Sequence, residues 1–201
     1  MTTTLAVPES LRSYFTDRAV QSVVDHMLES KASDVPPDLD WNEIRDFHMA
    51  HASAAKVRAD HAILLLDLWD AVWADALREH GITQDFPLNE YVKGAKPSPQ
   101  VLWNDSLYRI HRCVKRDEDL FITNTFIYED GEVYISLEYE KDGDWVELSS
   151  IPSGWEKDDD NSYSFSDKSV TIQKDTTHLD ITPLQQAAQE AVAAVVQAVT
   201  R

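Results

Sequence analysis

Apolar side chains recur at three- and four-residue steps through the first 81 residues, the spacing of amphipathic helices. One run extends from Pro8 to Glu29, and its continuous apolar stripe predicts a single helix. Pro8 suits the first turn of this helix, where its missing N–H group would have no partner. A second run extends from Trp41 to His80 without glycine or proline. Asp40 and Glu43 form a capping-box pattern at its start, and Gly81 fits the left-handed position that ends many helices.

A helix from Trp41 to His80 would be about 60 Å long at about 1.5 Å per residue. We therefore expect a break near Ser53–Arg58. Apolar residues are so dense between Ile63 and Leu77 that they surround most of the helix. This density predicts a place in the centre of a core or in an oligomer interface.

Residues 82–100 contain Pro87, Gly94, Pro97 and Pro99 and are typical of a linker or loop. Beyond them the period changes from helical to alternating. Phe121–Tyr128 and Val133–Tyr139 are rich in β-branched and aromatic residues, and the Asp130-Gly131 pair between them is a strong hairpin signal. Leu107–Val114 fits a first strand and a short helix equally well.

Two more turns are expected further along the chain. Asp142-Gly143 leads into a strand at Trp145–Leu148. A hairpin around Asp167-Lys168 is expected to join Tyr163–Phe165 to Val170–Gln173. These segments together predict an antiparallel β-meander.

The chain ends in a third helical pattern, with an apolar face of small side chains from Leu184 to Val199. Thr182, Pro183 and Gln185 form a T-x-x-Q capping box at its start. The fold class is therefore predicted as α+β, with an N-terminal helical region, an antiparallel meander and a C-terminal helix. We divide the chain into 1–81, 82–100 and 101–201, with one compact domain as the alternative.

Charge is unevenly distributed along the chain. The 36 acidic and 18 basic residues give a net charge of −18. Twelve acids and two lysines between Glu129 and Asp160 contribute −10 of this charge, whereas six bases and one acid between Lys93 and Arg116 contribute +5. A chain this acidic repels nucleic acid, and basic surfaces or cations are its expected partners.

Two interpretations of the acidic segment remain open: a solvated face that keeps the protein soluble, and a contact surface. In the second, carboxylates approximate the phosphates of a nucleic acid and block the basic nucleic-acid-binding surface of a nuclease or DNA-binding complex. Phage-encoded DNA-mimicking inhibitors, such as anti-CRISPR proteins, and nuclease immunity proteins use this logic, and the chain is similar to them in charge, size and α+β character alone. The contact residues expected are Glu129, Asp130, Glu132, Glu138, Glu140, Asp142, Asp144, Glu147, Trp155, Asp158, Asp159 and Asp160.

The sequence contains no recognised catalytic motif, so we expect a binding protein rather than an enzyme, without cofactor or metal. The helical histidines His26, His48, His51, His61 and His80 lack metal-ligand spacing. A metal-dependent enzyme that uses the strand and loop carboxylates is the alternative function. The single cysteine, Cys113, suits a reducing cytoplasm, which would be the host cytoplasm for a phage protein, and no segment indicates membrane insertion or secretion.

The helical faces Ile63–Leu77 and Leu184–Val199 also predict assembly. A single sheet face covers only part of a helix that is apolar around most of its circumference, so we expect a homo-oligomer, most simply a dimer. The alternative is that both helices bury these faces within one chain.

Overall fold

The computed structural model describes residues 2–82, 84–86, 109–116, 119–141, 144–146, 148, 152–158 and 162–199, with the backbone alone for 84–86, 109–116 and 199. Several sequence predictions fall outside these residues. They are most of the 82–100 linker, the turn residues 142 and 143, and the expected contact residues Asp142, Glu147, Asp159 and Asp160.

The predicted helix over Pro8–Glu29 is wrong in one respect, because it is two helices, α1 (Glu9–Thr16) and α2 (Arg18–Glu29). The backbone of Asp17 between them is extended (φ −129°, ψ 106°), and its carboxylate accepts hydrogen bonds from the backbone N–H groups of Ala19 and Val20. Asp17 is thus an N-cap, which ends one helix and begins the next.

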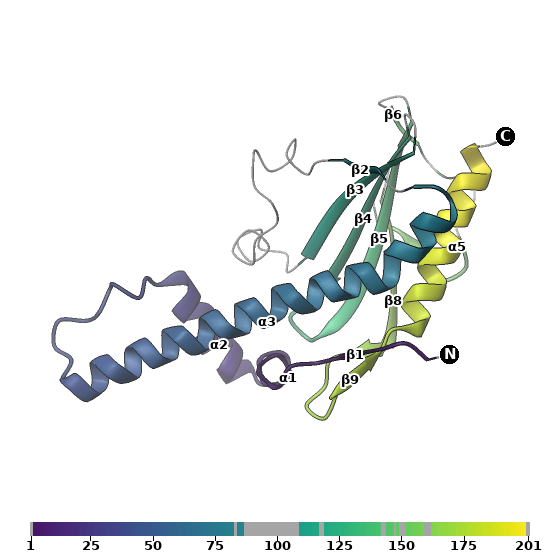
Figure 1. Cartoon of the computed structure of the whole chain (residues 1–201). Helices are drawn as coiled ribbons and strands as arrows, with labels where there is room; N and C mark the ends of the chain where they lie inside the picture. The colour runs from purple at the N-terminus through teal and green to yellow at the C-terminus, as the bar shows by residue number, and fades with distance from the viewer. Residues whose placement is uncertain are drawn as a thin grey trace.

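The long helix α3 (Trp41–Glu79) has no break, so the interruption expected near Ser53–Arg58 is wrong. The predicted capping box is confirmed, since Asp40 accepts from the Glu43 N–H while the Glu43 carboxylate accepts from the Asp40 N–H. Gly81 has the expected positive φ of 71°. Figure 1 shows α3 running past the sheet, with its N-terminal half alongside α2.

A seven-stranded antiparallel sheet forms the second layer. Its strands follow the order β2 (Gln84–Phe86), β3 (Arg109–Arg116), β4 (Asp119–Ile127), β5 (Glu132–Lys141), β8 (Ser162–Thr171) and β7 (Glu156–Lys157), with β6 (Asp144–Trp145) paired to the end of β5. The meander and the hairpin at Asp130-Gly131 are confirmed, and β3 settles the Leu107–Val114 alternatives in favour of a strand.

The hairpin predicted around Asp167-Lys168 is wrong, because β8 continues through both residues. Between the pairs Glu132–Thr171 and Tyr134–Ser166, β5 advances by two residues and β8 by five. The polar segment is therefore a bulge, in which the Asp167 carboxylate accepts from the Ser169 N–H.

The N-terminal segment pairs with the strand that precedes the last helix, in a small antiparallel sheet of β1 (Thr4–Ala6) and β9 (His178–Asp180). The C-terminal helix α5 (Thr182–Val199) follows, but its predicted T-x-x-Q box is replaced by other contacts. Thr182 Oγ1 accepts from the Thr3 N–H, and Gln185 Nε2 donates to the Ala71 carbonyl of α3. The Asp180 carboxylate accepts from the Thr182 N–H in place of the predicted cap.

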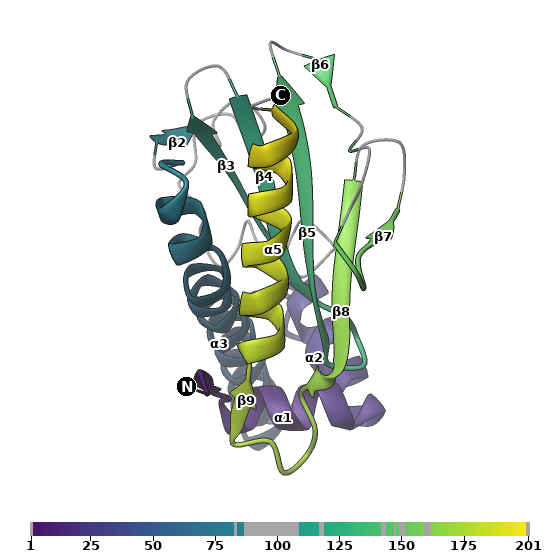
Figure 2. The ribbon, with the colours of Figure 1, turned by 90° about the vertical axis from the view of Figure 1, so that its right-hand side faces the viewer.

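Helices α3 and α5 cover one face of the sheet (Figure 2). The indoles of Trp69 and Trp73 donate to the hydroxyls of Thr123 and Thr125 on β4, which places the odd-numbered residues of β4 on the helix side. One core cluster joins buried residues of the N-terminal helices, the sheet and α5. The α+β prediction is confirmed. No helix in the described part of the chain is long and apolar enough to cross a bilayer.

The β4–β5 turn makes a testable prediction about Gly131. Its φ is +84°, and a Cβ there would lie 2.7 Å from the Ile172 carbonyl oxygen and 3.3 Å from Phe15 Cβ. We expect Gly131→Ala to lower the free energy of unfolding by about 2–4 kcal/mol, measured by urea denaturation.

Gly81→Ala is the matched control, because Gly81 also has positive φ but nothing within 4 Å of the added Cβ. It should cost only about 1 kcal/mol. Equal losses in the two variants would show that the contact with Ile172 is unimportant.

Candidate functional site

All described acids of the predicted contact surface except Asp158 lie in two groups at opposite ends of β5. Glu129, Asp130 and Glu132 lie at the β4–β5 turn, while Glu138, Glu140 and Asp144 lie where β5 pairs with β6. At about 3.4 Å per residue, Glu132 and Glu138 are about 20 Å apart along the strand. We call these the turn group and the β6 group.

Glu138 and Glu140 of the β6 group lie on the sheet face opposite the helices, whereas Asp144 is paired with Lys141 and so has the orientation of the odd-numbered residues of β5, toward the helix side. Glu138 is opposite Ile122, an even-numbered residue of β4, and Glu140 is two residues further along the same face. Their side chains are half-buried and about 7 Å apart along the strand, whereas that of Asp144 is exposed.

Strands β7 and β8 add two more acids beside Glu138. Ser162, opposite Glu138, accepts at its carbonyl from the Asp158 N–H, and Ser164 Oγ donates to the Asp158 carboxylate at 2.7 Å. Glu156 is exposed and is opposite Ser164. Glu156 belongs to the acidic segment but was not among the expected contact residues, because only the strand register shows that it shares a face with Glu138.

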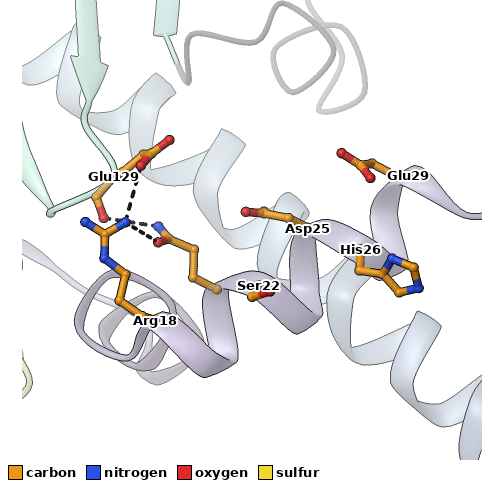
Figure 3. Close-up of a pocket in the computed structure, with 7 residues that line it drawn as sticks. Arg18, Ser22, Asp25, His26, Glu29 and Glu129 are labelled. Atoms are coloured by element: carbon orange, nitrogen blue, oxygen red, sulfur yellow. Dashed lines mark hydrogen bonds and ion pairs between the residues drawn. The ribbon is translucent and has the colours of Figure 1, made fainter.

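The turn group borders an open hollow of about 500 Å³ over α2. Arg18 lies at the edge of this hollow, with its Nη1 at 3.3 Å from Glu129 Oε2 and 3.2 Å from Gln21 Oε1. Gln21 Nε2 donates a hydrogen bond to the Glu129 carbonyl. Figure 3 shows the carboxylates of Asp25 and Glu29 pointing from α2 toward the side where Glu129 lies. Three carboxylates thus line the hollow, and that of Glu129 contacts the Arg18 guanidinium.

The carboxyl of Asp25 has a raised pKa. Burial raises its pKa, the neighbouring charges of Glu129 and Glu29 raise it further, and a hydrogen bond from the Tyr14 hydroxyl at 2.8 Å opposes them. A cationic group in the hollow would favour ionised Asp25. The sequence did not indicate Asp25 and Glu29 as site residues, because only the packing of α2 against the β4–β5 turn brings them to Glu129.

Trp155 does not belong to an exposed contact surface. Its side chain is buried, with its ring centroid 6.5 Å from that of Trp73 and 5.9 Å from that of Phe165. Its acidic neighbours in the sequence suggested exposure, but the chain turns the indole into the core. We therefore leave Trp155 out of the contact surface.

The faces expected to form a dimer are largely buried within one chain. Leu64, Leu68 and Trp73 of α3, and Leu184 and Val192 of α5, are at most 2% exposed. Both helices cover the sheet, as Figure 2 shows. The observation that motivated a dimer through Ile63–Leu77 and Leu184–Val199 is thus removed for most of these residues.

The described residues contain no group of three or more His, Cys, Asp or Glu side chains placed to hold a metal ion. Comparisons with protein families, curated proteins and solved structures find no match for this chain. The assignment of a function to the candidate site therefore depends on geometry and charge alone.

Proposed function

We propose that this protein binds a basic nucleic-acid-binding surface of a partner protein and blocks it. The observation that carries the proposal is one face of the sheet, on which the strand register gathers four carboxylates, those of Glu138, Glu140, Glu156 and Asp158. Strands hold them with little loss of side-chain freedom on binding, so they can stand where phosphates would. Such a protein is an inhibitor, of the phage anti-defence type or the nuclease-immunity type, acting in the cytoplasm.

The net charge of −18 supports this mode of action. Long-range attraction would steer the protein to a basic partner, while nucleic acid itself is repelled. The turn group and the hollow over α2 provide a second acidic contact about 20 Å away, which suits a partner groove wide enough to hold a nucleic acid. Because the acids are partly exposed, each pair contributes about 0.2–1 kcal/mol and binding depends on their number.

Displacement of DNA tests the proposal. A panel of purified basic nucleases and DNA-binding proteins, each loaded with a fluorescent duplex, is titrated with the protein, and the release of duplex is followed by anisotropy. We expect at least one panel member to release its duplex, with an inhibitory concentration that rises with salt. For that member, the triple variant E138Q/E140Q/E156Q should inhibit about 10- to 100-fold less well.

The matched control is D67N/E79Q/E190Q, which removes the same charge from exposed sites on α3 and α5. It should inhibit nearly as well as the wild type. Equal losses in both variants would show that only net charge matters, and no release from any panel member would contradict the proposal. Circular dichroism checks that both variants are folded.

A further inference from the structure

The N-terminal part of α3 carries an exposed apolar stripe that the sheet does not cover. Trp41 is 86% exposed, Ile63 55% and Leu66 37%, and Ala52 and Ala55 are exposed between them. From Ala52 through half-buried Ala59 to Leu66 these residues follow three- and four-residue steps on one side of the helix, and Trp41 lies on the same side beyond exposed Arg45 and His48. We call Trp41, Ala52, Ala55, Ala59, Ile63 and Leu66 the α3 stripe.

The stripe ends where α3 reaches the sheet. Trp69 and Trp73, one and two turns beyond Leu66, are buried and hydrogen-bonded to β4. From Trp41 to Leu66 the helix is about 39 Å long. Figure 1 shows this part of α3 extending away from the sheet with α2 alongside.

Side-chain size along the stripe is self-complementary. Bulky residues lie at both ends and alanines in the middle, so a two-fold axis between Ala52 and Ala55 would place Trp41 of one helix opposite Leu66 of the other. Small central residues allow the two helix axes to approach closely, and the bulky ends fill the space where the helices diverge. In this register each helix begins where the partner's stripe ends, so the overlap matches the exposed length.

Charge also favours a second copy of the chain over other occupants. Trp41–Leu66 contains three acids and three bases, Glu43, Asp46 and Asp60 against Arg45, Lys56 and Arg58, so this segment is neutral in a chain of −18. A basic partner is attracted more strongly to the acidic groups elsewhere. A copy of this neutral helix meets no net repulsion at the contact itself.

We propose that α3 mediates an antiparallel, two-fold homodimer through the α3 stripe. A stripe covering a third of a helix of about 12 Å diameter buries about 500 Å² per copy, or about 1,000 Å² in total. This area is at the lower limit for a specific interface, so the dimer dissociates in the micromolar concentration range. Closed two-fold contacts of this kind stop at two copies.

Sedimentation equilibrium of the full chain tests the proposal at concentrations from about 1 to 500 µM. The expected mass rises from 22.9 kDa toward twice that value, and the dimer strengthens with salt because salt screens repulsion between the acidic bodies. Partner binding under the proposed function weakens with salt, so the two proposals fail separately. A mass that stays at 22.9 kDa throughout overturns the dimer.

Two variants test the interface and its direction. Ala52→Glu should raise the dissociation constant at least tenfold, whereas Ser53→Glu, exposed about 100° around the same helix, should leave it within twofold. In the antiparallel register the double variant A52E/A55K pairs Glu with Lys across the two-fold axis and recovers the dimer. A double variant that stays monomeric, like Ala52→Glu alone, overturns this register.

Discussion

Replacement of Trp73 by alanine is expected to lower the free energy of unfolding by about 3–5 kcal/mol. The Trp73 side chain is fully buried, packs against Trp155 and donates its indole N–H to Thr125 Oγ1 at 3.2 Å. Its removal leaves a large cavity between α3 and the sheet and leaves the Thr125 hydroxyl without its indole donor. Urea denaturation monitored by circular dichroism measures the loss, which corresponds to a Tm lower by about 6–20 °C.

Trp41→Ala is the matched control on the same helix, because Trp41 is 86% exposed. At protein concentrations where the chain is monomeric, it should change the free energy of unfolding by less than about 0.5 kcal/mol. Trp73→Phe keeps an aromatic ring but loses the hydrogen bond, and we expect an intermediate loss of about 1–3 kcal/mol. If Trp73→Ala cost no more than Trp41→Ala, the contact between α3 and β4 would not be part of the core.

Acid should destabilise the protein through His61. The imidazole is 2% exposed and its ring centroid is 5.5 Å from that of Phe15. Burial lowers the pKa of His61 from 6.5 to about 3. Between these values the unfolded chain binds a proton that the folded chain does not, so stability decreases as the pH falls, by up to about 1.4 kcal/mol per pH unit.

His61→Leu removes this contribution and tests it directly. We compare the free energy of unfolding at pH 6.5 and 4.5 for the wild type, His61→Leu and His26→Leu, where His26 is exposed on α2. The wild type and His26→Leu should lose about 2–3 kcal/mol more than His61→Leu over this interval. Equal losses in all three proteins would contradict the assignment to His61.

Some of the fold is predictable from local pattern alone. Asp40, Glu43 and Gly81 mark the ends of α3 by chemistry that acts within a few residues, and Asp130-Gly131 does the same for the β4–β5 turn. Asp17 carries a similar N-cap signal, but the apolar steps continue on both sides of it and favour one helix. Its capping hydrogen bonds decide the outcome in the structure.

Other features depend on partners distant in the sequence. Asp167-Lys168 forms a bulge because β8 remains paired with β5 on both sides of it, which the polar composition alone does not reveal. The length of α3 led to the prediction of a break that the structure does not have. A helix of 39 residues can remain continuous because part of it runs beyond the sheet.

The candidate site, like the fold, was predictable from the sequence only in part. The sequence identifies the acidic segment, because charge can be counted along the chain. It does not reveal that the acids separate into two groups, nor that Asp25 and Glu29 of α2 join Glu129. Trp155 shows the limit most clearly, because a residue among acids in the sequence lies beside Trp73 in the core.

The pairing of β1 with β9, just before α5, has a consequence for synthesis on the ribosome. The apolar face of α3 is covered by β4 and α5, and α5 ends about 120 residues after α3. At a translation rate of about 5–20 residues per second, the apolar face of α3 stays uncovered for roughly 6–24 s before α5 is complete. Thr4 is synthesised 176 residues before its partner Asp180. Early docking of α1 and α2 on α3, or the binding of a chaperone, would protect this face until α5 has been made.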